Sequence, residues 1–362
     1  MRYFQKQVKH FYIFCTLTLF ISLSVSIAFS FFPPARSQTV STGDDFIKWV
    51  DFTPSCTALS DCLNYDINNH GEKHHASWID LLATLAARGN GTFSSYKTSD
   101  LKKITDALSS GTPLSEITDK LKSFPYYKEA YTAVLGGFVG EFEIEKPTDD
   151  GEKTIEKQYG LKAFSPIAKG YAYSHFDDFG SSRAYGFRRK HLGHDMMGSV
   201  GTPVIAVESG YVEAVGWNQY GGWRIGIRSF DKKRYYYYAH LRKDHPYNDI
   251  YEGKIVTAGD VIGYLGMTGY STKENVNNIN TPHLHWGMQL IFDESQKEAV
   301  SEIWIDLYAI TKLLEKNKSQ TYRPEGSKEF ERKFQMFEPS VDSFSLSAIA
   351  KTRKNEHTRE ND

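Results

Sequence analysis

Cysteine is scarce in this sequence, which has only 3 cysteines among 362 residues. Cys15 lies in an apolar stretch near the N-terminus, and Cys56 and Cys62 follow that stretch. The spacing of the last two does not fit the C-x-x-C pattern of redox or zinc pairs, so those sites are excluded. In an oxidising exterior, Cys56 and Cys62 would be able to form one short-loop disulfide.

An excess of either charge sign is also lacking. Lys and Arg number 43 against 44 Asp and Glu, which gives a formal net charge of −1. The basic runs at 188–190 and 232–234 are short. Because a protein that binds nucleic acid needs a basic surface, the composition predicts no nucleic-acid partner. The length corresponds to about two globular domains.

Charge is missing altogether from residues 11–32, which follow Arg2, Lys6 and Lys9. The apolar core of a signal peptide usually has about 7–15 residues, whereas a membrane-spanning helix needs roughly 20. The stretch therefore favours an uncleaved anchor over residues 1–35, with its basic tip in the cytoplasm and the rest of the chain outside. Small residues such as Ala28 and Ala35 leave a cleaved signal as the alternative.

Changes in composition divide the rest of the chain. A capping-box-like start at Ser77 and an end at Gly89 indicate one helix, and Leu101, Ile104 and Leu108 recur at helical spacing. Short β-rich segments broken by glycine occupy the second half, and a closing amphipathic helix is expected over 303–314. The predicted parts are a linker at 36–45, a helical domain at 46–143, a linker at 144–158, a β-rich domain at 159–316 and a partly disordered tail at 317–362. Closely spaced strands without intervening helices predict an α+β protein whose main domain is an antiparallel β-sandwich.

Histidines in two short motifs mark the candidate site. His191 and Asp195 form an H-x-x-x-D motif, and His283 and His285 form an H-x-H motif on a predicted strand, where residues i and i+2 share a face. His240 ends a tyrosine-rich strand between them. Two imidazoles and a carboxylate suit Zn²⁺ and leave a fourth position open for water, as in catalytic zinc sites. Each of these signals is weak by itself, and His240 alone would be explained equally well as a packed residue. Together they predict a zinc hydrolase with one zinc per chain.

At this point the residues resemble a family, the lysostaphin-type (LytM-type) zinc endopeptidases of bacterial cell walls, whose domain has the duplicated hybrid motif fold. The resemblance covers roughly 160–315 and not the helical segment. The matching motifs, in family order, are 191–195, 201–206 with Gly210 and Val212, 238–241, 258–263, 266–269 and 283–286.

The resemblance implies roles for five residues. His191, Asp195 and His285 would bind zinc, and His240 and His283 would act on the water and the developing oxyanion. It also implies peptidoglycan peptides as substrate and, with the anchor, a single-pass protein of the bacterial cell membrane whose catalytic domain is extracytoplasmic. His194 stands where the family usually has an apolar residue, so we interpret it as structural.

Two further segments are less informative. His70, His74 and His75 could suggest a second metal site, but a solvated loop accounts for them better, and His175 and His245 have no supporting pattern. Residues 273–281 form an Asn-rich insertion before the H-x-H strand, at a position where the family often has none. Loops of this kind commonly set substrate specificity. The sequence is nearly as compatible with a surface loop that takes no part in substrate binding.

The main alternative function is a non-catalytic scaffold, because the same fold occurs as an interaction module with protein partners in cell-envelope complexes. Such relatives have usually lost ligands, whereas all five site positions are kept here. A histidine phosphocarrier would need neither Asp195 nor an exterior location. The sequence therefore favours an extracytoplasmic zinc endopeptidase.

Overall fold

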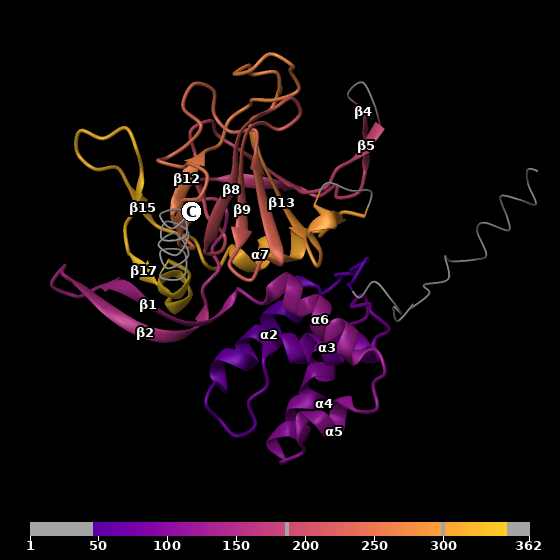
Figure 1. Ribbon diagram of the computed structural model, residues 1–362. Coiled ribbons are helices and arrows are strands. Elements are labelled where there is room, and N and C mark those ends of the chain that lie inside the picture. The colour runs from indigo at the N-terminus through magenta and orange to yellow at the C-terminus, as the bar shows by residue number, and fades with distance from the viewer. Residues whose placement is uncertain (1–45, 185–187, 298–300, 346–362) are drawn as a thin grey trace, which may run out of the picture. The chain divides into compact units, whose positions relative to one another are not determined.

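The computed structural model describes residues 46–184, 188–297 and 301–345 (Figure 1). Within them, residues from Ile47 onward form one compact unit. The predicted anchor at 1–35 and the linker at 36–45 lie outside the described residues. No helix within the described ranges has the length and apolar character needed to span a membrane.

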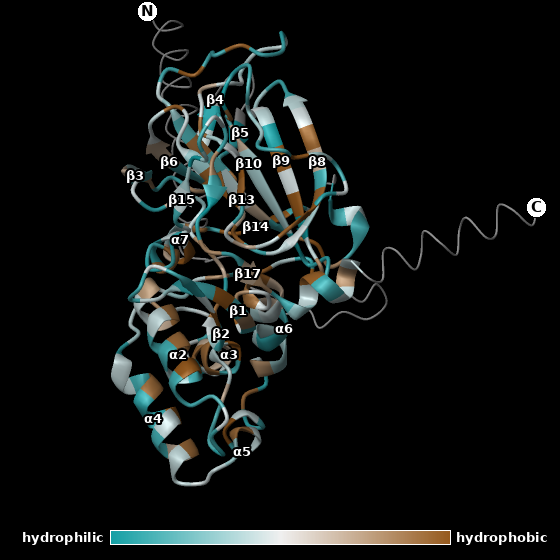
Figure 2. Cartoon of the chain, turned by 90° about the vertical axis from the view of Figure 1, so that its left-hand side faces the viewer, coloured by the Kyte–Doolittle hydropathy of each residue, from teal (hydrophilic) through white to brown (hydrophobic). Residues whose placement is uncertain are grey.

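Several helices precede the sheets, as predicted. They are α2 (Cys56–Asn68), α3 (Trp78–Arg88), α4 (Thr98–Ser109), α5 (Leu114–Thr118) and α6 (Phe124–Leu135). The expected cap of α3 is present, because the Ser77 side chain accepts a hydrogen bond from Asp80 N. Leu101, Ile104 and Leu108 are buried along one side of α4, and α2 and α4 show both hydrophilic and hydrophobic sides in Figure 2. Cys56 and Cys62 are free, so the disulfide between them is not formed.

An eight-stranded antiparallel sheet forms the centre of the β-rich part (Figure 1). Its order is β11-β8-β9-β10-β13-β6-β3, with β14 paired to β13. The strands are β3 (Tyr173–Phe176), β6 (His194–Gly198), β8 (Gly210–Asn218), β9 (Gly222–Ser229), β10 (Arg234–Ala239), β11 (Ile255–Val256), β13 (His283–Leu290) and β14 (Ile303–Trp304). The predicted α+β class with antiparallel sheets is confirmed.

Smaller sheets and short helices surround this sheet. They are β1 (Val139–Pro147) with β2 (Lys153–Leu161) and β17 (Met336–Phe337), β4 (Ser182–Ala184) with β5 (Arg188–Lys190), β7 (Pro203–Ile205) with β12 (Val261–Tyr264), β15 (Thr321–Tyr322) with β16 (Glu331–Arg332), the 3-10 turn η1 (Glu294–Gln296) and α7 (Tyr308–Leu314). The closing helix predicted over 303–314 is therefore too long. Its first residues pair with β13 instead, where Trp304 lies opposite Gln289.

The segment predicted as a linker, 144–158, instead forms most of the β1–β2 hairpin. Its polar composition reflects a solvated hairpin with cross-strand ion pairs such as Lys153 Nζ to Glu145 Oε2 at 2.8 Å and Lys146 Nζ to Glu156 Oε2 at 2.6 Å. The predicted tail is ordered through 345, because its β17 pairs with β1 and its Glu338 is buried. Residues 346–362 lie outside the described residues.

The buried side chain of Arg234 joins the sheet to the helical part. Arg234, on β10, is 1% exposed, and its Nε lies 2.7 Å from Glu208 Oε2. The same guanidinium donates through Nη1 to Ala133 O, near the end of α6, at 2.8 Å. Because one hydrophobic core also includes residues of both parts, the helices and the sheet fold as a single unit.

Candidate metal centre

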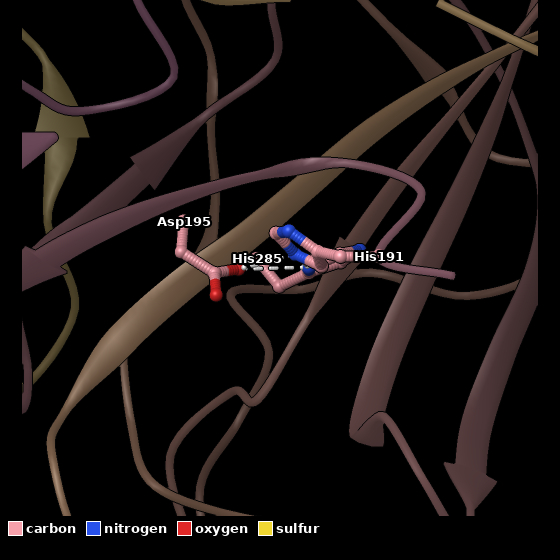
Figure 3. A group of neighbouring side chains, drawn as sticks. All are labelled: His191, Asp195 and His285. Atoms are coloured by element: carbon pink, nitrogen blue, oxygen red, sulfur yellow. Dashed lines mark hydrogen bonds and ion pairs between the residues drawn. The ribbon is translucent and has the colours of Figure 1, made fainter. Parts of the chain in front are cut away.

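His191, Asp195 and His285 point toward one another beside the neighbouring strands β6 and β13 (Figure 3). Asp195, on β6, lies directly opposite His285, on the neighbouring β13. His191 lies just before β6 and reaches the same point because the chain turns at Gly193. A Cβ at Gly193 would lie 2.5 Å from the His285 ring, so only glycine lets this segment pass so closely.

Three atoms with lone pairs converge at this point. His285 Nδ1 is 2.8 Å from Asp195 Oδ1 and 2.9 Å from His191 Nε2, and His191 Nε2 is 3.1 Å from the same oxygen. Ligands bound at 2.0–2.1 Å around a tetrahedral zinc are separated by about 3.3 Å, which is close to these values. Two imidazole nitrogens and one carboxylate oxygen, buried together, therefore fit a zinc ion. The structure brings together the three ligands that the sequence predicts.

The protonation states suit metal binding. Burial opposes ionisation of Asp195, but its close contacts with His191 and His285 outweigh this effect and hold the pKa of that carboxyl well below its usual value. Burial lowers the pKa of His285, although Asp195 acts in the opposite direction. Asp195 is thus charged and His285 neutral at pH 7, the forms in which both groups bind metals.

The other two predicted residues, His240 and His283, lie beside the three ligands. The rings of His240 and His283 are 4.7 Å apart between centroids, and His240 is 5.8 Å from the His285 ring. His240 follows β10 with a φ of 61°, a left-handed conformation that turns its side chain out of the strand. The predicted grouping of all five residues is therefore present, while their individual roles remain predictions.

Backbone carbonyls orient both of these rings. Nδ1 of His240 lies 2.9 Å from Thr268 O, and Nδ1 of His283 lies 2.8 Å from Thr281 O. A carbonyl only accepts hydrogen bonds, so each Nδ1 carries the proton and each Nε2 is left to accept one. Nε2 of His283 is buried, has no hydrogen-bond partner among the described residues and lies 3.7 Å from Asp195 Oδ2.

The pKa of His240 keeps its ring in the neutral form. Burial lowers this pKa well below its usual value, and the nearby rings of His283 and His285 lower it further. The ring is therefore neutral at pH 7 and its Nε2 lone pair is available to accept a proton.

A groove leads to these residues. A cavity of about 450 Å³ is lined by Asp195 and His283 and by residues 278–281 of the inserted segment. Its remaining lining is Phe176, Arg183, Met197 and Tyr270. The predicted insertion is thus a wall of the groove.

The other histidines in the described ranges do not join this group. His194 is buried, its Nε2 is 2.8 Å from His175 Nδ1, and its pKa is lowered to about 4 by burial and by the charge of His175. His75 contacts the buried Asp66 at 2.7 Å, and His70 stacks on Tyr159. Among the described residues, the one cluster suited to a metal ion is that of His191, Asp195 and His285.

Sequence reasoning missed two residues behind the ligands, Asp178 and Arg183. Arg183 Nη2 donates to Asp195 Oδ2 at 2.8 Å and to Asp178 Oδ2 at 2.8 Å. Asp178 Oδ1 lies 2.6 Å from His191 Nδ1. Both stand in a polar segment without a recognisable motif, so no signal in a single sequence distinguishes them from surface charges.

Comparison with known proteins gives concordant results. Residues 189–300 match the model of peptidase family M23. The L-Ala–D-Glu endopeptidase of Bacillus subtilis is 35% identical over 181 residues, which cover 50% of this chain and 51% of that protein. Lysostaphin of Staphylococcus simulans is 41% identical over 97 residues, which cover 26% of this chain and 17% of that protein.

A solved structure of the lysostaphin catalytic domain from the same species is 31% identical, covers 39% of this chain and 92% of that chain, and has a TM-score of 0.30. The chain spans about half the length of the first of these relatives and less than a fifth of the second. The matched segment contains all five predicted site residues and neither Asp178 nor Arg183.

Proposed function

We propose that this chain, whose residues 189–300 form a peptidase family M23 domain, is a zinc endopeptidase that hydrolyses peptide bonds of peptidoglycan. The observation that carries the proposal is the convergence of His191 Nε2, Asp195 Oδ1 and His285 Nδ1, with two further histidines beside them. The named activities of the relatives, an L-Ala–D-Glu endopeptidase and lysostaphin, support a cell-wall peptide as the substrate.

The three ligands and the two neighbouring histidines divide the work. His191, Asp195 and His285 would hold a zinc ion, which would supply Lewis acidity that lowers the pKa of water from about 15.7 toward about 7. Of His240 and His283, one accepts the proton of the attacking water through Nε2. The other takes a proton from solvent at Nε2 and donates a hydrogen bond from that nitrogen to the oxyanion that forms on the peptide carbonyl, and the first ring passes the proton of the attacking water to the leaving amine. The carbonyls of Thr268 and Thr281 keep both rings in the required orientation.

The direct test of this function is hydrolysis of purified peptidoglycan, followed as the release of new amino groups. We expect release by the full chain, its loss with a chelator and its return when zinc is added. Undiminished release in the presence of the chelator would contradict a zinc-dependent reaction.

The inserted segment is held in place as part of the groove. Asn275 Oδ1 accepts hydrogen bonds from Trp223 Nε1 and Asp244 N, both at 2.9 Å, and Asn278 Nδ2 donates to Tyr270 O at 2.7 Å. Ile279 is 9% exposed, which fixes the segment against the fold. The amides of Asn278 and Asn280 consequently stand at the groove edge, where they are suited to bind substrate amides or hydroxyls.

We therefore expect Asn280→Ala to change which muropeptide is cut, or how fast, without loss of zinc. Asn280 is exposed and borders the groove, and loss of a hydrogen bond to substrate should weaken binding by about 0.5–1.5 kcal/mol, roughly 2–12-fold in kcat/KM. Asn277→Ala is the matched control, because Asn277 is also exposed and does not line the groove. Equal product patterns and rates for both variants and the parent would show that the insertion does not select substrate. Deletion of 275–280 is the stronger form of the same test.

We further propose that residues 1–35 anchor the enzyme as a single-pass protein of the bacterial cell membrane, with the catalytic domain outside. Support comes from three cations before an apolar stretch of membrane-spanning length. Protease added to intact spheroplasts should remove the domain beyond residue 36, while the anchor stays with the membrane. A mature N-terminus just past the apolar stretch would instead indicate a secreted enzyme with a cleaved signal.

A further inference from the structure

A small polar network lies directly behind two of the three metal-binding residues. Its centre is Asp178, just after β3, which receives hydrogen bonds from Ser181 Oγ at 2.9 Å and from Arg183 Nε at 3.2 Å. Arg183, on β4, binds both oxygens of Asp178 through Nη2, at 2.8 and 3.0 Å. The two side chains are 19% and 17% exposed, so the network is largely shielded from water.

Asp178 contacts the ring nitrogen of His191 that faces away from the metal-binding point. The distance from Asp178 Oδ1 to His191 Nδ1 is 2.6 Å, while His191 Nε2 faces Asp195 and His285. A carboxylate so close to Nδ1 favours the proton on that nitrogen through its charge, although the contact is an ion pair and not an in-line hydrogen bond, and so it leaves the lone pair on Nε2 for a metal. It also raises the basicity of Nε2, as carboxylates behind metal-bound histidines do.

Arg183 acts on the second ligand. It donates to Asp195 Oδ2 at 2.8 Å, whereas Asp195 Oδ1 faces His191 and His285. One oxygen of this carboxylate is thereby occupied by the guanidinium and the other is left for the metal. Arg183 also binds Asp178, which contacts His191. One guanidinium therefore links Asp195 to the carboxylate behind His191 and fixes the distance between them.

We propose that Asp178 and Arg183 are positioning residues that set the zinc affinity of the site, Asp178 by orienting His191 and Arg183 by restricting Asp195 to one-oxygen binding. This inference rests on the proposed zinc site, and it adds two residues outside the segment that matches the family model. Because neither residue contributes a ligand atom, their effect is on the strength and geometry of metal binding.

The experiment measures the zinc dissociation constant of the full chain by competition with a chromophoric chelator. We expect Asp178→Ala to weaken binding by about 10–100-fold, the usual effect of removing such a support. Asp178→Asn keeps the shape and an acceptor oxygen without the charge, so its loss should be smaller. Asp177→Asn is the matched control, because Asp177 is exposed and adjacent in sequence, and it should bind zinc like the parent.

Arg183→Gln provides the second arm, with Lys190→Gln as its control for loss of a nearby exposed cation. We expect weaker zinc binding for Arg183→Gln and, in the cobalt-substituted protein, a changed visible spectrum that reports altered coordination by Asp195. Unchanged far-ultraviolet circular dichroism of each variant would establish that it is folded.

Parent-like zinc affinity in both Asp178→Ala and Arg183→Gln would overturn the inference. Higher KM for substrate with parent-like zinc affinity would overturn it as well, because Arg183 would then serve the substrate and not the metal. A parent chain that binds no zinc would mark failure of the proposed function itself, which this measurement separates from failure of the two supports.

Discussion

Alanine at His283 or at His240 should slow peptide hydrolysis by about 10²–10⁴-fold while most of the zinc stays bound. This range is the usual contribution of a positioned acid or base. Both rings lie beside the three ligands and neither belongs to the cluster suited to a metal. The measurements are kcat and KM on a defined muropeptide, together with the metal content of each variant.

His245→Ala is the control for this prediction. His245 is exposed and pairs with Glu329. It belongs neither to the predicted metal ligands nor to the lining of the groove, so its removal should leave the rate near that of the parent. Full loss of zinc from His240→Ala or His283→Ala would make that residue a ligand. The division of the five residues into three ligands and two catalytic residues would then be wrong.

Asp195→Ala should remove stoichiometric zinc and abolish hydrolysis. The substitution leaves two imidazoles where three ligands are needed, and it deprives Arg183 of one of its two carboxylate partners. Metal analysis of the parent should find about one zinc per chain, and analysis of the variant should find little after dialysis.

The control here is Asp177→Ala, which removes an exposed carboxylate from the neighbouring strand end and should keep the zinc. The variant Asp195→Ala should also remain folded, because the hydrophobic core consists of many other buried residues and does not include Asp195. Zinc content equal to that of the parent in Asp195→Ala would refute the ligand assignment.

The five central residues could be singled out because they stand in short motifs, whose combination resembles a known family that implies their roles. The H-x-H motif on a strand places His283 and His285 two residues apart on one face, and the structure has both on β13. Asp195 then needs only the neighbouring strand in the observed register, opposite His285. In the same way, Ser77 and Gly89 identified the ends of α3 because capping depends on adjacent residues.

Features that depend on distant partners escaped the sequence. The polar segment 144–158 resembles a linker in composition, and only its pairing across the β1–β2 hairpin makes its charges complementary. Residues 303–304 are apolar and continue the helical pattern of the segment that follows, but they pair with the end of β13 instead. Asp178 and Arg183 act through contacts with His191 and Asp195 that no local spacing encodes.

The most direct test of the account is digestion of purified muropeptides with the full chain and identification of the products by mass. A zinc endopeptidase of peptidoglycan should give pairs of fragments whose masses sum to that of the substrate plus one water, with the break at a peptide bond. The pairs should disappear with a chelator and with His283→Ala. Intact muropeptides after prolonged incubation with the zinc-loaded chain would instead identify a non-catalytic envelope protein, and a break at a glycosidic bond would contradict the proposed reaction.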